Sequence, residues 1–177
     1  MMLTRNLTSS AWLLFIALLL TGLQPSRARA ESLPVVHVQE SSDLLADGQV
    51  AKARQVPILI MFSMHQCPYC TVVREEFLKP MLRNKDYADK VIIREVHTDN
   101  YSSLRDFNGQ LISPADLGQR YNASLAPTVV FVDGQGRELA KRLVGITTVD
   151  YYGGFLDDAI ATSLQRLRRV VLNQVVE

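Results

Sequence analysis

Hydrophobic residues follow two alternating patterns along this chain. Short apolar runs, rich in β-branched residues and bounded by proline or polar residues, predict strands. Longer stretches in which apolar residues recur at helical spacing predict helices. The expected strands are residues 35–38, 57–62, 91–96, 128–132 and 137–144, and the expected helices are residues 43–54, 68–78, 113–122 and 149–172. Ser41 or Ser42 is the expected cap of the first helix.

The order of these segments predicts the architecture. Strands and helices alternate as far as residue 132, and such alternation favours parallel strands joined by crossover helices. The turn residues Asp133–Gly136 then join the last two strands as an antiparallel hairpin. We therefore expect an α/β fold with a mixed central sheet and helices on both faces. Lys79–Pro80 should stop or kink the second helix, and residues 97–109 should form a polar loop.

The beginning of the chain has a pattern of its own. Arg5 precedes an apolar stretch at residues 11–20, and a small-residue cleavage signature occupies residues 28–30. These are the three parts of a secretory signal peptide. An uncleaved membrane anchor is the alternative, but the apolar stretch is short for a span, which needs about 20 apolar residues. We expect residues 1–30 to be a signal peptide and residues 31–177 to form one domain, exported to the periplasm.

The charge of the chain argues against one class of partner. The whole sequence has a formal net charge of +1. The expected signal peptide holds three arginines and no acidic residue, so its removal brings the charge to −2. A chain without a basic excess lacks the electrostatic footprint of a nucleic-acid-binding protein. We expect contact with a membrane only during export.

The only two cysteines, Cys67 and Cys70, lie between a predicted strand and a predicted helix. In an oxidising compartment two cysteines usually form a disulfide. A bridge across so short a loop adds little chain-entropy stabilisation, so a purely structural purpose is disfavoured. A strand that leads into Cys-x-x-Cys at the start of a helix indicates redox cycling or metal binding.

The positions of the two cysteines predict different roles. Cys67 lies at the N-terminus of the predicted helix, where unpaired N–H groups and the helix dipole stabilise a thiolate. Cys70 lies one turn further along the same face and can resolve a mixed disulfide by attacking Cys67. Pro68 suits the first helical position. Tyr69 is expected to be exposed and to influence substrate access and redox potential.

Three features together resemble the thioredoxin-fold thiol–disulfide oxidoreductases. Residues 67–70, Cys-Pro-Tyr-Cys, stand between strand and helix; residues 126–128, Ala-Pro-Thr, stand directly before a strand; and Gly145 follows the terminal hairpin. The resemblance covers roughly residues 43–164 and is to exported thioredoxin-like proteins of the SoxW type. It implies a thioredoxin fold with a cis-proline, Pro127, that faces the cysteines.

The resemblance also implies how a substrate would bind. Pro127, preceded by Ala126, would hold an extended backbone edge beside the sulfurs, to which a substrate peptide could pair by β-addition. His65, two residues before Cys67, has two interpretations. Protonated, it would further stabilise the Cys67 thiolate; otherwise it is an ordinary loop histidine on the rim of the site.

One position departs from the family pattern. Plain thioredoxins carry a buried aspartate six residues before the first cysteine, where this chain has Met61. The family's lysine in the neighbouring strand corresponds to Glu95. Glu95 is therefore either a relocated proton acceptor for Cys70 or a solvated strand residue paired with Arg94.

The leading functional prediction is a periplasmic thiol–disulfide oxidoreductase that needs no cofactor. Its substrates would be protein disulfides or dithiols, and a redox partner would recharge its dithiol. The resemblance to exported thioredoxin-like proteins favours reduction as the direction. One alternative is a copper-binding metallochaperone that uses Cys67, Cys70, His65 and Met64 as soft or borderline ligands. Another is a non-catalytic binding domain built on the same fold.

Overall fold

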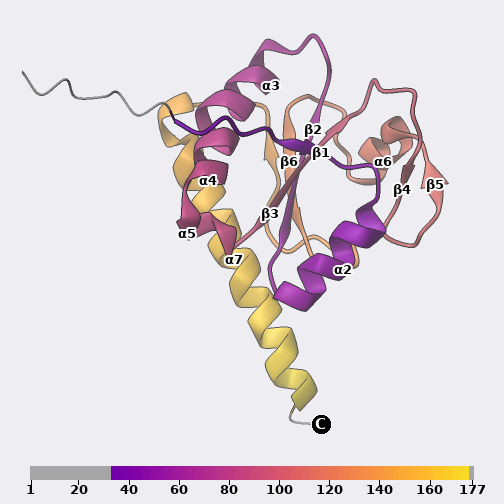
Figure 1. The fold of residues 1–177 in the computed structure, drawn as a ribbon, viewed down its shortest axis with the longest axis vertical. Coiled ribbons are helices and arrows are strands. Elements are labelled where there is room, and N and C mark those ends of the chain that lie inside the picture. Colours follow the sequence, from indigo (N-terminus) through magenta and orange to yellow (C-terminus); the bar gives the residue numbers. More distant parts are fainter. Residues whose placement is uncertain (1–32, 176–177) are drawn as a thin grey trace, which may run out of the picture. The chain divides into compact units, whose positions relative to one another are not determined.

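The computed structural model describes residues 33–175, which Figure 1 colours by sequence. The chain divides into two units, Met1–Leu33 and Pro34–Glu177, and the fold below is that of the second unit. The expected signal peptide lies outside the described residues. Among the helices of the described part, none is long and apolar enough to span a bilayer.

A five-stranded mixed sheet forms the centre of the fold. Its strands lie in the order β1-β3-β2-β6-β7. β3 pairs in parallel with β1 and β2, whereas β2 with β6 and β6 with β7 are antiparallel. This arrangement confirms the expected mixed sheet. The strand bounds are Gln39–Glu40 for β1, Ile58–Ser63 for β2, Ile92–His97 for β3, Thr128–Val132 for β6 and Leu143–Val144 for β7.

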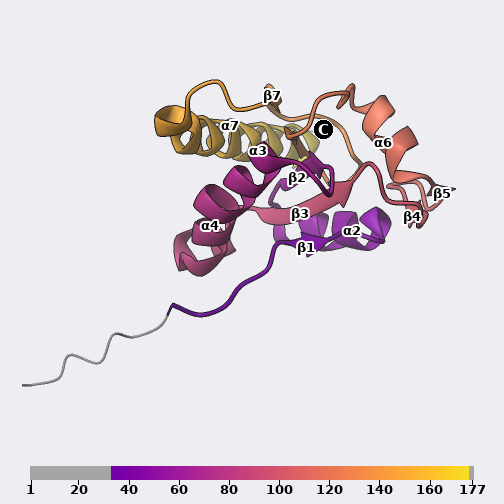
Figure 2. The same ribbon diagram turned by 90° about the horizontal axis from the view of Figure 1, so that it is seen from above.

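Helices cover both faces of this sheet, and Figure 2 shows α2 and α7 on opposite sides of it. On one face, α2 (Leu44–Arg54) and α6 (Pro114–Arg120) pack on a hydrophobic core that includes Phe62. On the other face, α7 (Val149–Val175) and the helices after the cysteines pack on a core that includes Met61. Met61 and Phe62 are neighbours in β2, and they point into different cores because side chains alternate along a strand.

The helical segment after the cysteines is longer than the sequence predicts. It runs through α3 (Pro68–Val72), η2 (Val73–Leu78) and α4 (Lys79–Arg83) and passes Pro80. η2 is a π-helical stretch, at the end of which the first N–H of α4 donates to the carbonyl of Arg74. A π turn shifts the hydrogen-bond register, so it accommodates a proline that has no N–H to donate. The sequence allowed a stop or a kink at this proline, and the structure excludes the stop.

Three boundaries differ from the expected ones. The first strand is β1 rather than residues 35–38, where Val35 is largely exposed. The cap of α2 is Asp43, which accepts a first-turn N–H at 2.9 Å, rather than either preceding serine. Asn84 caps a short helix, α5 (Lys85–Ala88), where a polar connection was expected.

Part of the expected loop at 97–109 belongs to a small hairpin. Its strands are β4 (Leu104–Arg105) and β5 (Leu111–Ile112), which pair antiparallel. Asp106 holds the connecting turn, because its carboxylate accepts two backbone N–H groups of that turn at 2.9 and 2.8 Å. The same carboxylate accepts the guanidinium of Arg120 at 2.6 Å, which ties the hairpin to the end of α6.

The terminal hairpin is less regular than residues 137–144 suggest. β7 contributes only two residues, and one isolated bridge joins Val132 to Glu138. The turn of this hairpin lies against α2. A Cβ atom on Gly48 of α2 would lie 2.5 Å from the carbonyl oxygen of Gly134, so only a residue without a side chain fits at this crossing.

Candidate redox site

The two cysteines lie beyond the carboxyl end of β2, where α3 begins. Their Sγ atoms are 2.09 Å apart, so the pair forms a disulfide. Cys67 is half-buried, whereas Cys70 is fully buried. Pro68 occupies the first helical position, and the side chain of Tyr69 is exposed. Both placements agree with the sequence prediction.

Cys67 caps α3 with its sulfur. Its backbone is extended, with φ −113° and ψ 101°, and its Sγ accepts the Cys70 N–H at 3.1 Å. A sulfur in this position faces the positive end of the helix, and after reduction the same arrangement stabilises a thiolate. The Cys67 sulfur is therefore the more accessible of the two, and the Cys70 sulfur is shielded.

Pro127 borders this site from the neighbouring strand. The Ala126–Pro127 peptide bond is cis, which confirms the expectation from the family resemblance. β6 pairs with β2 so that Thr128 lies opposite Phe62, and Pro127 therefore lies at the end of β2 from which the cysteine loop departs. The Pro127 carbonyl accepts the Gly145 N–H at 2.7 Å. Gly145 has φ 65°, a left-handed conformation that favours glycine.

Exposed apolar side chains occur in each segment that borders the disulfide. Met64 precedes the motif, Tyr69 lies within it, Leu125 precedes the cis-proline and Val144 precedes the glycine bonded to that proline. Single exposed apolar residues are ordinary on protein surfaces. These four residues lie in or next to the cysteine motif, the cis-proline and the glycine bonded to it, and are called the apolar rim below. Exposed apolar side chains beside an extended backbone segment suit an extended peptide.

Glu95 is buried on the same side of the sheet as the cysteine helix. It lies opposite Met61 in the β2–β3 pairing, and its exposed fraction is 3%. Arg74, which follows Cys70 by one helical turn, donates from Nε to the Glu95 Oε2 at 2.9 Å. The Ser63 hydroxyl donates to the Glu95 Oε1 at 2.6 Å. The interpretation of Glu95 as a solvated residue is therefore wrong.

Arg94 is not the partner of Glu95. Successive side chains of a strand point to opposite faces, so Arg94 points toward α2. There its guanidinium pairs with the Asp47 carboxylate, with Nη2 and Oδ1 2.7 Å apart. The sheet thus separates two ion pairs, Arg94 with Asp47 on one face and Arg74 with Glu95 on the other.

The hydrogen bonds to Glu95 decide its charge. Burial alone would raise the pKa of Glu95, but the bonds from Arg74 and Ser63 outweigh burial and keep this pKa below its ordinary value. The bond to Glu95 in turn raises the pKa of Arg74. The site therefore contains a carboxylate–guanidinium pair at neutral pH. The role of Glu95 as proton acceptor for Cys70 stays a prediction.

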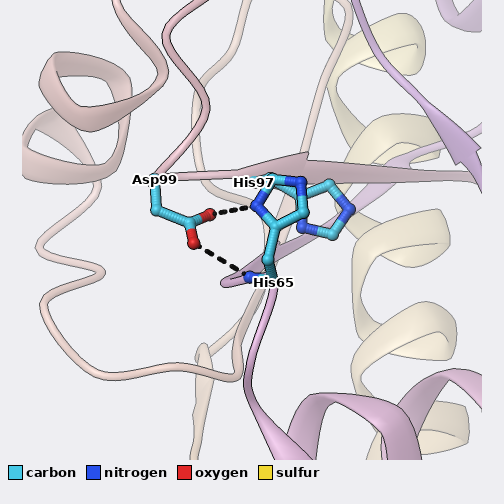
Figure 3. A group of neighbouring side chains, drawn as sticks. All are labelled: His65, His97 and Asp99. Atoms are coloured by element: carbon cyan, nitrogen blue, oxygen red, sulfur yellow. Dashed lines mark hydrogen bonds and ion pairs between the residues drawn. The ribbon is translucent and has the colours of Figure 1, made fainter.

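His65 is exposed, and its side chain lies beside those of Asp99 and His97 (Figure 3). Its backbone N–H donates to the Asp99 carboxylate at 3.0 Å, and its ring Nδ1 is hydrogen-bonded to the same carboxylate at 2.9 Å. Its ring stacks on that of His97, with centroids 4.5 Å apart. The copper alternative combines His65 with both cysteines, whereas here the two sulfurs are bonded to each other.

Sequence reasoning missed several polar residues of the site: Ser63, Arg74, His97 and Asp99. Ser63, His97 and Asp99 come together through the pairing of β2 with β3, in which Ser63 lies opposite His97, whereas Arg74 lies in η2, on the helical segment of the cysteines. The Ser63 hydroxyl is 3.0 Å from His97 Nδ1, so hydrogen bonds connect buried Glu95 with the rim. Aligning the carboxyl ends of the two predicted parallel strands would have pointed to Ser63, His97 and Asp99, and helical spacing from Cys70 would have pointed to Arg74.

The fold and the site define a class: thioredoxin-fold proteins with a Cys-x-x-Cys disulfide at a helix start and a cis-proline beside it. The model of the thioredoxin-like domain matches residues 46–160. This chain therefore belongs to the thioredoxin-like family. Together with the Cys67–Cys70 disulfide, this membership supports thiol–disulfide redox activity. No protein among the curated sequences matches the chain.

Solved structures with the same fold are distant in sequence. The DsbH oxidoreductase is 18% identical, and the match covers 76% of this chain and 96% of that protein, with a TM-score of 0.52. Thioredoxin O2 from Arabidopsis thaliana, in its oxidized state, is 17% identical over 72% of this chain and 97% of its own, with a TM-score of 0.46. At such identities the likeness shows the fold alone.

Proposed function

We propose that this protein is a periplasmic thiol–disulfide oxidoreductase that reduces disulfides in protein substrates. The observation that carries the proposal is the Cys67 sulfur, which is half-buried and caps α3 by accepting the Cys70 N–H. A thiolate at this position is both stabilised and accessible, which are the two requirements for attack on a disulfide.

The proposed reaction transfers two electrons from the protein dithiol to the substrate. The Cys67 thiolate attacks one substrate sulfur, so a mixed disulfide forms and the other substrate sulfur leaves as a thiolate. Cys70 then loses its proton and attacks the Cys67 sulfur. The substrate sulfur that was bonded to Cys67 leaves as a thiolate, and the Cys67–Cys70 disulfide seen in the structure remains. A dithiol donor must reduce this disulfide before the next cycle.

The proton of Cys70 needs an acceptor inside the protein. Cys70 is fully buried, and Met61 cannot accept a proton. Glu95 is the carboxylate beside Met61 on this face, and its partner Arg74 lies one turn after Cys70 on the same helix. We assign the acceptor role to Glu95 on this placement.

The substrate would bind as an extended peptide. Pro127 and Ala126 form the backbone segment before β6, and the apolar rim lies in the segments around it. Backbone pairing with this segment would give affinity for many sequences, while the rim would favour apolar residues next to the substrate cysteine. Unfolded or partly folded proteins present such segments.

The proposed compartment and direction have separate support. The pattern of residues 1–30 supports export, and the resemblance to exported thioredoxin-like proteins supports reduction. Fractionation of cells that express the full chain tests the compartment. We expect the protein in the periplasm with Glu31 as its first residue; an intact protein in the cytoplasm would contradict this.

Insulin reduction by the dithiol-fed protein tests the activity. Cys67→Ser should abolish turnover, because no other sulfur is placed to attack a substrate. His37→Ala changes an exposed residue outside the site and should retain full activity. Turnover that persists in Cys67→Ser would refute the catalytic assignment.

Trapping identifies the substrates. In Cys70→Ala the mixed disulfide on Cys67 cannot be resolved, so substrate proteins should remain attached and can be named by mass spectrometry. The double variant that also carries Cys67→Ser is the matched control, and it should retain none of them.

A further inference from the structure

Three potential metal ligands meet beside the redox site: His65, His97 and Asp99 (Figure 3). One ligand atom from each lies within 4.8 Å of the others. His65 follows β2 by two residues, His97 ends β3, and Asp99 follows it by two. Because β2 and β3 are parallel, with Ser63 opposite His97, their carboxyl ends bring all three residues to one edge of the sheet.

Hydrogen bonds hold the backbone of this cluster in place. The Thr98 N–H donates to the Ser63 carbonyl at 2.8 Å, and the Thr98 hydroxyl donates to the same oxygen at 3.1 Å. The His65 N–H donates to the Asp99 carboxylate at 3.0 Å. The segments that carry the three side chains are therefore fixed to each other across the two strands. A site whose ligands are already near one another loses little entropy on binding an ion.

We propose that His65, His97 and Asp99 form a binding site for a late first-row divalent cation, with Zn²⁺ as the representative ion. Two imidazoles and one carboxylate suit Zn²⁺ and its neighbours, whereas Mg²⁺ and Ca²⁺ favour sites made of oxygen alone. Three protein ligands leave a position for water. The site contains no sulfur, so it differs from the copper alternative in both its ligands and its ion.

Solvent access and charge favour a cation here. The His65 side chain is 61% exposed and that of Asp99 is 32% exposed, so a hydrated ion can reach both. The Asp99 carboxylate supplies one negative charge to the cluster. The Glu95 carboxylate lies behind the cluster, 3.6 Å from His97 Nε2, and is itself neutralised by Arg74.

Binding requires one local change. The two imidazole rings are stacked, with 22° between their planes. A ring nitrogen binds a metal in the plane of its ring, so two stacked rings cannot both point at one ion. The Ser63 hydroxyl occupies His97 Nδ1, so Nε2 is the nitrogen left for the ion, because its 3.6 Å distance from Glu95 is too long for a hydrogen bond. His65 is exposed and can turn. The ion then replaces the hydrogen bond between the His65 ring and Asp99.

A calorimetric titration of the oxidised protein with Zn²⁺ tests this site. In the oxidised protein both sulfurs are in the disulfide, so they cannot ligate the ion. We expect one Zn²⁺ ion to bind to each protein molecule. When Co²⁺ is used in place of Zn²⁺, its visible spectrum should be that of nitrogen and oxygen ligands. His65→Ala, His97→Ala and Asp99→Asn should each weaken binding by at least about tenfold.

Two variants serve as matched controls. The chain has three histidines, and the third, His37, is exposed and outside the cluster, so His37→Ala should bind Zn²⁺ like the unchanged protein. Asp89→Asn removes an exposed carboxylate elsewhere and should also have no effect. Because His65 is exposed, its replacement tests the site even if the His97 variant fails to fold.

Three results would overturn the proposal. The first is no Zn²⁺ binding by the oxidised protein. The second is equal loss of binding in His37→Ala and His65→Ala. The third is binding that appears only after reduction, which would assign the ion to the cysteines.

Discussion

Cys67 and Cys70 belong to one short loop, yet the structure gives their sulfurs different surroundings. Cys67 is half-buried and accepts a hydrogen bond at the start of a helix, whereas Cys70 is fully buried behind it. Reactivity of a thiol depends on its thiolate fraction and on access. Both factors favour Cys67.

Alkylation of the reduced protein should therefore be selective. At neutral pH we expect iodoacetamide to modify Cys67 first, with Cys70 modified only after much longer exposure or after unfolding. Peptide mass spectrometry at successive times gives the two rates. Equal rates would mean that the buried sulfur becomes exposed on reduction.

Glu95 and Arg74 depend on each other, because removing one charge leaves the other partly buried without a partner. Glu95→Gln should lower the free energy of unfolding by about 2–3 kcal/mol, somewhat less than a fully buried pair would lose, since the Arg74 side chain is 22% exposed. If Glu95 accepts the Cys70 proton, the same variant should also slow resolution of a mixed disulfide.

A surface carboxylate on the same helical segment provides the control for this prediction. Glu75 pairs with Lys79, and its side chain is 44% exposed. Glu75→Gln should change the free energy of unfolding by no more than about 0.5 kcal/mol and should leave resolution unchanged. Urea unfolding and stopped-flow resolution measure the two effects separately. If the Glu95→Gln variant resolves a mixed disulfide at the normal rate, Glu95 is not the proton acceptor and its role is purely structural.

The sequence was informative about single residues only where a motif named them. The cysteines, Pro68 and Pro127 occupy fixed places along the chain, so their roles could be predicted. His97 and Asp99 are ordinary residues in sequence, and their importance arises from a pairing between distant strands. Glu95 had two open interpretations because its burial depends on Arg74, which the sequence places on a different element.

At the scale of elements, the β4–β5 hairpin shows how one side chain can organise a segment with few apolar residues. Asp106 is almost completely buried and accepts hydrogen bonds from the turn and from Arg120. Burial acts to raise the pKa of Asp106, but these bonds outweigh it and place this pKa below its ordinary value. A polar loop was expected here because the bonds of one buried carboxylate leave little trace in a hydrophobic pattern.

The lowered pKa of Asp106 predicts a pH dependence of stability. A depressed pKa in the folded state contributes stability above the unfolded value of about 3.9. That contribution is lost as pH falls through the folded value. Asp106→Asn should lower the free energy of unfolding at pH 7 by about 1–3 kcal/mol, and the difference from the unchanged protein should shrink in acid.

Urea unfolding of both proteins at neutral pH and near pH 3 checks this expectation. Arg120 is half-exposed, so most of the effect should come from the backbone N–H groups rather than from the ion pair. Asp158→Asn changes an exposed carboxylate and should show no such dependence. A difference between Asp106→Asn and the unchanged protein that is equally large in acid would contradict the assignment.

The crossing of α2 with the terminal hairpin makes a second prediction at this scale. Alanine normally stabilises a helix relative to glycine by about 1 kcal/mol. At Gly48 the added Cβ would collide with the Gly134 carbonyl, so Gly48→Ala should instead lower stability by about 1–3 kcal/mol. Gly154, in α7, has open space at its Cβ position, and Gly154→Ala should raise stability. Thermal unfolding should therefore shift in opposite directions for the two variants.

At the scale of the whole domain, the fold was predictable because each main strand and helix can be recognised from its own stretch of sequence. Buried parallel strands read as apolar runs, and crossover helices read as amphipathic stretches, so their order implies the layers. The length of β7, the π-helical stretch and the short hairpin were not predictable. Each depends on contacts between segments that are far apart in sequence.

The two ion pairs on either side of β3 have a consequence for strand pairing itself. A shift of β3 by one residue turns every side chain to the opposite face. A shift in one direction would bring Glu95 to the place of Arg94, beside Asp47, and a shift in the other direction would bring Arg94 to the place of Glu95, beside Arg74. Either shift therefore places like charges together. Two adjacent residues of opposite sign thus make the misaligned sheet electrostatically unfavourable, in addition to the apolar residues that it would misplace. The polar network beside the disulfide thereby helps to select the one alignment in which the site can exist.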